Sequence, residues 1–189
     1  LDKLQNLNFR LERNSNENNF IEAKFLGKEL QSKHLKALLK IKNQLIKLDL
    51  SNTNLNDNLM SKLKNLENLK YLKLNDTEIS DEGLVSINKS AESLNLNNTS
   101  VTYEGLVTFL ENSNLKKAYL WNTNISIDNQ KELNEKYTTE FNFGAKNFAK
   151  GMPLSIPVLI SEQTLFKDSL LIEIYKSIGN PKFRYTTKN

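Results

Sequence analysis

The stretch KLDLSNTNL, residues 47–55, recurs three more times along the chain. Its later copies are YLKLNDTEI at 71–79, SLNLNNTSV at 93–101 and KAYLWNTNI at 117–125. In each copy, two apolar residues separated by one other residue precede a Thr, and these threonines stand 24, 22 and 24 residues apart. The apolar pair is typical of a short strand that turns alternate residues inward, and a regular period of this length predicts a stack of similar units.

Extending the copies gives the template L-x-x-L-x-L-x-x-T-x-L. It is filled by Leu45, Leu48, Leu50, Thr53 and Leu55, then Leu69, Leu72, Leu74, Thr77 and Ile79, then Ala91, Leu94, Leu96, Thr99 and Val101, and finally Leu115, Ala118, Leu120, Thr123 and Ile125. This pattern resembles the leucine-rich repeat, with Thr in place of the usual Asn or Cys. The resemblance implies an α/β solenoid with a short parallel sheet on its concave face and helices on its convex face. The repeats would be 45–68, 69–90, 91–114 and 115–137.

Each unit continues with a segment of helical periodicity. We expect Asp57, Ser80 or Asp81, and Thr102 to cap these helices, and each repeat Thr to bond turn backbone that would otherwise be buried unpaired. The first helix is expected to turn Leu59, Leu63 and Leu66 inward. Gly83 and Gly105 lie in first turns, where we expect close contact with the neighbouring repeat.

The flanking segments are expected to cap the stack, because terminal repeats would otherwise expose their core. Residues 1–44 predict an N-terminal β-hairpin and a helix, with Leu7, Phe9 and Leu11 alternating along the first strand. In the following degenerate unit, the template places are taken by Phe20, Ala23, Phe25 and Leu30, with Lys28 in the Thr position. A helix near 129–137 and a closing strand at 138–144, carrying Phe141 and Phe143, complete a domain at residues 1–144.

The chain changes character after Gly144. Residues 145–154 predict a linker, and 155–189 a partial β segment with strands near 155–160, 168–175 and 182–187. LFKDSLLIEI at 165–174, followed by KFRYTTKN at 182–189, resembles the start of the Ig-like C-terminal module of chitobiase-type proteins. The Asp-Gly of that module's turn is replaced here by Lys188 and Asn189.

Together with the YLW-x-T unit at 119–123, these parts resemble membrane proteins of Bacteroidetes-like bacteria that join a haem c region, leucine-rich repeats and a chitobiase-type tail. The resemblance implies an extracytoplasmic location in the periplasm or cell envelope. The chain starts with Leu, so we expect it to be part of a longer protein, with any haem region or membrane anchor outside this segment.

Composition excludes several classes of function. The 189 residues include no cysteine, which excludes disulfides, thiolate nucleophiles and haem c attachment within the segment. The net charge is +4, but lysines alternate with acids and form no basic block, so we expect no nucleic-acid partner. No apolar run reaches 18 residues, so we expect no membrane insertion by this segment.

No constellation of catalytic residues stands out. His34 is the only histidine, and its place beside Leu35 favours a structural role at or below the surface. Asp49, Asp76 and Asp81 occupy separate positions along the repeats, so we expect no carboxylate cluster that could bind a metal ion. We therefore expect a non-enzymatic protein without a metal or cofactor.

The outward positions of the predicted strands are the candidate binding surface. Those singled out are Asp49, Tyr71, Lys73, Asn75, Asn95, Asn97, Lys117, Tyr119 and Trp121. Tyr and Trp are enriched at binding hot spots, so a protein partner is the first expectation. Aromatic faces also stack on sugars, so a carbohydrate-binding or glycan-accessory role is the alternative. Trp121 could equally pack against the C-terminal cap or the β segment after it.

Overall fold

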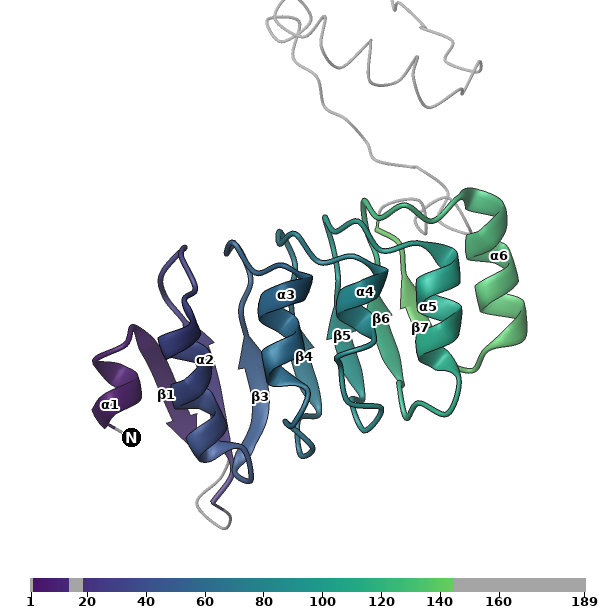
Figure 1. Ribbon diagram of the computed structural model, residues 1–189. Coiled ribbons are helices and arrows are strands. Elements are labelled where there is room, and N and C mark those ends of the chain that lie inside the picture. Colours follow the sequence, from purple (N-terminus) through teal and green to yellow (C-terminus); the bar gives the residue numbers. More distant parts are fainter. Residues whose placement is uncertain (1, 14–18, 145–189) are drawn as a thin grey trace, which may run out of the picture. The chain divides into compact units, whose positions relative to one another are not determined.

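The computed structural model describes residues 2–13 and 19–144 (Figure 1). The linker expected at 145–154 and the β segment expected at 155–189 lie outside these residues. The described residues form an α/β structure whose strands make one seven-stranded, mostly parallel sheet. This arrangement is compatible with the expected α/β solenoid.

The strands follow one another across the sheet in the order of the sequence. β1 pairs antiparallel with β2, as expected of an N-terminal hairpin, and every later neighbour pair is parallel. Their bounds are β1 Phe9–Arg13, β2 Ile21–Phe25, β3 Leu45–Asp49, β4 Tyr71–Lys73, β5 Ser93–Asn95, β6 Lys117–Tyr119 and β7 Glu140–Asn142. Equivalent repeat positions therefore lie side by side.

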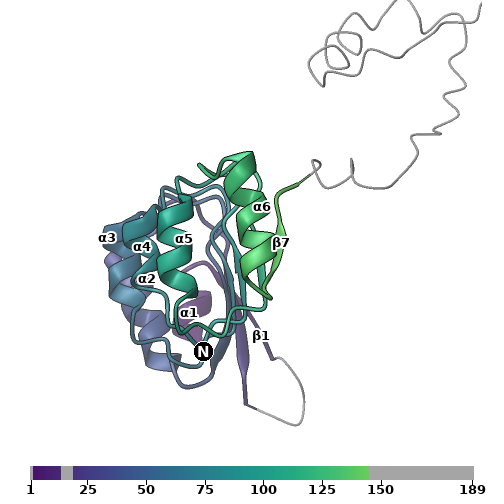
Figure 2. The ribbon, with the colours of Figure 1, turned by 90° about the vertical axis from the view of Figure 1, so that its right-hand side faces the viewer.

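Each parallel crossover carries helical residues. The helices are α1 Asp2–Gln5, α2 Ser32–Leu38, α3 Asp57–Met60, α4 Asp81–Leu84, α5 Tyr103–Leu110 and α6 Ile127–Lys136, and short 3₁₀ turns η1 Leu39–Ile41 and η2 Ser61–Leu63 extend α2 and α3. Figure 2 shows α2–α6 on one side of the sheet. No helix covers the other sheet face within the described residues, and we call it the open sheet face.

The core consists of leucine rows that cross the sheet. Leu48 pairs in register with Leu72, Leu72 with Leu94, and the row continues through Ala118 to Phe141. All five side chains are buried, as are those of the second row, Leu50, Leu74, Leu96 and Leu120. Burying one leucine contributes roughly 1.5–3 kcal/mol, so these rows supply much of the energy that stacks the units.

The N-terminal cap differs from the expectation in two places. Leu7 lies before β1 and not within it. The chain starts with the short helix α1, whose Leu4 is buried in the core. Phe20 does not take the first template place, because a register irregularity between Ile21 and Glu22 sets Ile21 opposite Leu45. Ile21 is buried, whereas Phe20 remains 37% exposed.

The helix starts are fixed by side-chain caps. Asn56, not Asp57, caps α3 by accepting the Leu59 N–H at 3.0 Å. Ser80, Thr102 and Ser126 cap α4, α5 and α6. The α3 turn also differs from the expected helical face, because Met60 and Leu63 are buried while Leu59 is only partly so.

The aspartates that follow two of these caps connect neighbouring units. The Asp57 carboxylate accepts the Ser80 N–H at 2.9 Å and the Ser80 hydroxyl at 2.5 Å. Asp81 accepts the N–H and hydroxyl of Thr102 at 2.8 and 2.6 Å. Each carboxylate thus satisfies the cap residue of the next unit, a connection that spacing alone did not predict.

The end of each strand is closed by its Thr and the residue before it. The Thr53 hydroxyl donates to the Leu50 carbonyl at 2.7 Å, and Thr77, Thr99 and Thr123 repeat this bond with Leu74, Leu96 and Leu120. The preceding residues have left-handed backbone, with φ of 59°, 58°, 54° and 54° at Asn52, Asp76, Asn98 and Asn122. Asn and Asp tolerate this conformation better than other side chains, which explains the Asn/Asp-Thr pair.

Candidate functional site

The open sheet face gathers the predicted binding residues from four strands into rows. The first row runs through Lys47, Tyr71, Ser93, Lys117 and Glu140, and the second through Asp49, Lys73, Asn95, Tyr119 and Asn142. A third row follows where the strands end, with Ser51, Asn75, Asn97 and Trp121. All nine predicted binding residues are therefore neighbours on one surface, because the strand alternation turns them away from the buried leucines.

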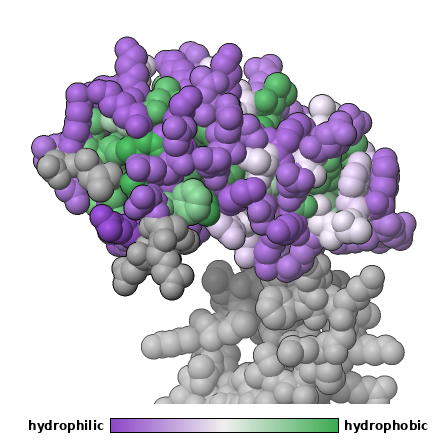
Figure 3. All heavy atoms as spheres, turned by 90° about the horizontal axis from the view of Figure 1, so that it is seen from below, coloured by the Kyte–Doolittle hydropathy of each residue, from purple (hydrophilic) through white to green (hydrophobic). Residues whose placement is uncertain are grey.

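Two aromatic side chains on this surface are exposed. Tyr71 is 45% exposed and Trp121 is 49% exposed. Tyr119, which is less exposed, lies beneath the Lys117 ammonium, 5.2 Å from Nζ to the ring centroid. Figure 3 views the molecule from below, along the edge of the sheet, and shows hydrophilic side chains with hydrophobic ones between them. Exposed rings on a polar surface are the usual anchors of a binding site.

Ion pairs lie toward the two ends of the sheet and also at its middle, where Lys70 and Lys116 both pair with Glu92 just before β5. At the N-terminal end, Lys47 pairs with Glu22 at 2.7 Å, and Lys24 with Asp49 at 3.5 Å. At the other end, Lys117 pairs with Glu140 at 2.8 Å. Such partly exposed pairs contribute little to stability, typically about 0–1 kcal/mol. They neutralise charge, so three of the four lysines on this face already have a carboxylate.

Two of these groups have shifted pKa values. Burial by itself would raise the pKa of Asp49, but hydrogen bonds from Ser51 and the charges of Lys24 and Lys73 together hold it below the ordinary value. The Ser51 hydroxyl donates to Asp49 Oδ1 at 2.7 Å. The Glu140 carboxylate, followed by Tyr119, raises the pKa of Lys117. Both residues are therefore charged at neutral pH.

Lys73 is the exception among the lysines of this face. It lies between Asp49 and Asn95 in the second row, and it is exposed. Among the residues that the structure describes, no carboxylate lies within ion-pair distance of its ammonium, although its charge helps to lower the pKa of Asp49. The centre of the face therefore carries one positive charge that no carboxylate neutralises directly.

The asparagines of β5 and the turn after it are held by backbone donors. The Asn97 N–H donates to Asn95 Oδ1 at 3.1 Å, and the Trp121 N–H donates to Asn97 Oδ1 at 2.8 Å. These bonds identify the oxygen of each amide, because a backbone N–H needs an acceptor. Asn75 differs, since its oxygen lies 2.7 Å from the Ser51 hydroxyl, whose single proton goes to Asp49, and its nitrogen donates to Asp76.

The Trp121 indole lies against Gly144. A Cβ atom on Gly144 would overlap the indole at Cδ1, and the Gly144 backbone has φ of +82°. Only glycine adopts that conformation without strain while leaving room for the ring. The closing segment thus contacts one edge of the indole, but nearly half of the side chain stays exposed.

Several contributors to this surface were not singled out from the sequence. Glu22, Lys24, Glu140 and Gly144 lie in the capping segments, which do not match the repeat template. Their signal was position: Glu22 and Glu140 stand opposite the Lys47 and Lys117 places, and each takes the charge opposite to its neighbour. Extending the strand register into the flanks would have found them.

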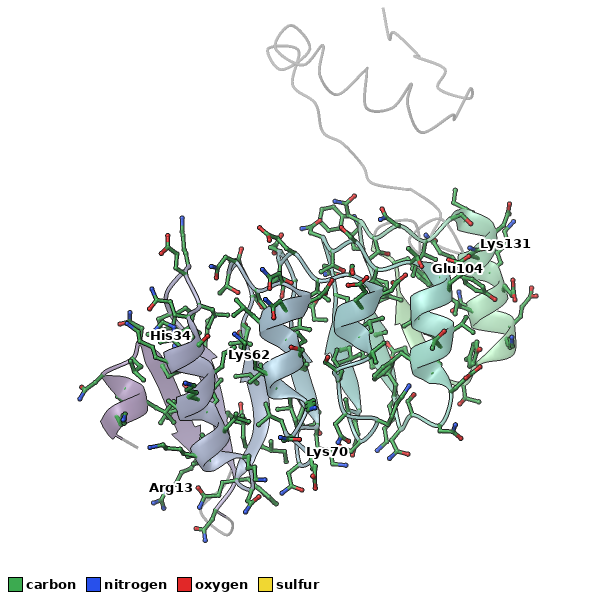
Figure 4. The ribbon with its side chains drawn as sticks, viewed as in Figure 1. Arg13, His34, Lys62, Lys70, Glu104 and Lys131 are labelled. Carbon is green, nitrogen blue, oxygen red and sulfur yellow. The ribbon has the colours of Figure 1, made fainter. Side chains whose placement is uncertain are left out.

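His34 lies away from this face, at the start of α2 (Figure 4). It is 6% exposed, its Nδ1 accepts the Gln31 N–H at 2.9 Å, and its ring packs 4.9 Å from that of Phe25. Burial and, secondarily, the charge of Lys33 lower its pKa. These contacts are those of a structural residue.

The described residues contain neither a metal-binding cluster nor a membrane-spanning helix. Within residues 2–13 and 19–144, no three His, Asp or Glu side chains come close enough to hold a metal ion. Among the helices of the same residues, none combines the length and apolar character that a bilayer crossing requires.

The chain was also compared with known proteins. No model of a known protein family matches it, and no curated protein sequence matches it significantly. The geometry of the site is therefore the basis for any functional inference.

Proposed function

We propose that residues 1–144 form a leucine-rich-repeat solenoid that binds a protein partner through its open sheet face and has no enzymatic activity. The observation that carries this proposal is the exposure of Tyr71 and Trp121 on opposite sides of β5, on a face that no helix covers in the described residues. Aromatic side chains held on rigid strands lose little conformational entropy on binding, which makes them effective anchors.

The repeat assignment is supported by the recurring Thr phrase, the in-register leucine rows and the shared turn hydrogen bonds. An extracytoplasmic location, in the periplasm or cell envelope, remains part of the proposal and depends on the resemblance to haem c, leucine-rich-repeat and chitobiase-type proteins. The proposal that residues 155–189 belong to an Ig-like module depends on the same resemblance.

A second candidate is carbohydrate binding. The exposed Trp121 ring and the neighbouring asparagine amides favour it, because sugars stack on indole faces and bond to amide groups. The two candidates share a surface but differ in their ligand.

The test is retention of ligands by the immobilised full chain, measured in parallel on an envelope protein fraction and on a glycan array. A single envelope protein that is retained by the wild type and lost in Tyr71→Ala and Trp121→Ala supports the first proposal. Val85→Ala is the control, because Val85 is 78% exposed directly after α4, on the helical side. Specific glycan retention lost in Trp121→Ala, without any protein, would overturn the protein-partner proposal in favour of the second candidate.

A further inference from the structure

The middle of the open sheet face is a strip of small polar side chains between larger ones. The β5 strip consists of Ser93, Asn95 and Asn97. It is flanked by Tyr71 and Lys73 on β4 and, on β6 and just beyond it, by Lys117, Tyr119 and Trp121. Neighbouring strands lie about 4.8 Å apart, so the flanking rows stand roughly 10 Å from each other across the strip. That spacing leaves room for one extended chain.

The β5 strip presents hydrogen-bond donors. Backbone N–H groups occupy the oxygens of both Asn95 and Asn97. The Nδ2 groups of both amides have no partner among the described residues, so each is available to a ligand. Lys73, which is the register neighbour of Asn95, adds a third donor and the positive charge. A row of donors is complementary to a ligand rich in acceptors.

The charge balance indicates an acidic ligand from outside this chain. The strands β2–β7 carry Lys24, Lys47, Lys73 and Lys117 on the open sheet face against Glu22, Asp49 and Glu140. Arg10 and Glu12 of β1 pair with each other, and Lys70 and Lys116 share Glu92 just before β5. Among these charged groups, only Lys73 lacks an ion pair. Residues 145–189 contain seven Lys and Arg against three Asp and Glu. That segment has the same sign as the face, which argues against it as the occupant.

The spacing along the strand selects the form of the ligand. Alternate residues of an extended chain stand about 6.8 Å apart, which is the period that separates Asn95 from Asn97. An extended peptide lying along β5 repeats its same-side side chains at this period. Of two carboxylates at alternate positions, one would then meet Asn95 and Lys73, and the other would meet Asn97. A neighbouring apolar side chain would contact the Trp121 ring.

We propose that the β5 strip binds an extended peptide segment with Asp or Glu at alternate positions, and that Lys73 selects the acidic residue. This inference rests on the proposed function and adds the chemical class of its partner.

The experiment measures binding of fluorescein-labelled octapeptides to the full chain by fluorescence anisotropy. The probes carry two Asp residues at alternate positions and one Phe in a Gly-Ser background. One control probe has Asn in place of both Asp residues. The other keeps the net charge but places the two Asp residues next to each other. We expect the alternate-Asp probe to bind about tenfold more tightly than the Asn probe, as charge-assisted hydrogen bonds require, and more tightly than the adjacent-Asp probe.

Variants then locate the site. Lys73→Glu should weaken binding of the alternate-Asp probe by about tenfold or more. Lys131→Glu changes the net charge of the protein by the same amount, but Lys131 lies on α6, so this variant should leave binding unchanged (Figure 4). Equal losses in the two variants, or equal binding of the two Asp probes, would overturn the inference by showing nonspecific charge attraction. Lys73-dependent binding of polygalacturonate, with no peptide binding, would also overturn it.

The outcomes separate this inference from the proposed function. Peptides that bind without acidic preference, yet are lost in Tyr71→Ala and Trp121→Ala, would overturn the inference and leave the proposed function intact. If the envelope protein retained in the pull-down is unaffected by both aromatic variants, the proposed function itself is overturned.

Discussion

The carboxylate of Asp81 lies against Cα of Gly105 in the next unit, where any Cβ atom would overlap it. Asp57 and Gly83 repeat this relationship one unit earlier. The two glycines therefore leave room for the carboxylates that bond Ser80 and Thr102. The third unit has Tyr103 in the Asp place, and the fourth has Asn129 in the Gly place. The fourth unit thus lacks the Gly, and the preceding unit lacks the Asp. This is expected if the glycine is needed only to make room for that carboxylate.

Gly105→Ala should destabilise the protein by about 1–3 kcal/mol, because the methyl group displaces the Asp81 carboxylate from Thr102. At a helix position with free space around it, a Gly→Ala change would stabilise the protein by up to about 1 kcal/mol. Urea unfolding measures the difference. In an Asp81→Ala background the cost should shrink or change sign. A cost that is unchanged in that background would show that the carboxylate is not the cause.

The buried Thr hydroxyls should each contribute measurably to stability. Thr77→Val preserves shape but leaves the Leu74 carbonyl without its hydroxyl donor, at an expected cost of about 1–2 kcal/mol. Thr77→Ser keeps the hydroxyl and should cost less. Thr108→Val is the control, because that hydroxyl is exposed and bonds within its own helix. Equal midpoints of thermal unfolding for Thr77→Val and Thr108→Val would contradict the role of the turn bond.

The left-handed residues before these threonines should resist substitution by alanine. Asn98→Ala places a Cβ-bearing residue without a polar side chain at φ of 54°, and it removes the bonds to Asp76 and from Asn122. We expect a loss of about 1–2 kcal/mol. Asn98→Gly relieves the backbone strain and should recover part of that loss. Chemical unfolding of the two variants gives the comparison, and a glycine variant less stable than the alanine one would contradict it.

Much of this fold follows from the sequence because one period fixes the neighbours of every strand residue. Once Leu48 and Leu72 occupy equivalent places, Asp49 and Lys73 must be neighbours on the opposite face. The flanks were predicted only in outline, as a hairpin and a closing strand, because they lack this constraint. The irregularity at Ile21 shifts the template by one residue, and nothing in the spacing of Phe20, Ala23 and Phe25 reveals it.

The connections between units were harder to predict than the units themselves. The bonds from Ser80 to Asp57 and from Thr102 to Asp81 link residues more than 20 positions apart. A search for caps considers only neighbouring positions, so it assigned Asp57 to its own helix. For the same reason, the contact of Trp121 with Gly144 could not be read from the KAYLWNTNI stretch alone.

Trp121 is the only tryptophan, so its fluorescence reports on its surroundings. A ring that is 49% exposed and contacts Gly144 should be only partly quenched by iodide. Gly144→Ala should push the indole outward and increase the quenching. The Stern–Volmer constants of the two proteins measure this. Wild-type quenching equal to that of free tryptophan would show that the indole does not contact Gly144 in solution.

His34 should make stability depend on pH near and below the ordinary imidazole pKa. Burial and then Lys33 lower the pKa of the folded-state imidazole below its ordinary value of 6.5. At pH values between the folded and unfolded pKa, the unfolded chain therefore binds more protons, and stability falls as the pH drops below 6.5. The Asp49 carboxylate, whose pKa is also lowered, loses its contribution only at more acidic pH, below the ordinary value of 3.8.

His34→Gln separates this effect from all others, because His34 is the only histidine and a glutamine oxygen can still accept the Gln31 N–H. The urea midpoint of the wild type should fall between pH 7 and pH 5, and that of the variant should stay nearly constant. Protonation removes the Nδ1 acceptor and places a charge beside the Phe25 ring in the buried cap, so the loss arises in the folded state. Parallel midpoint curves for the two proteins across this range would show that His34 is free to accept a proton in the native protein.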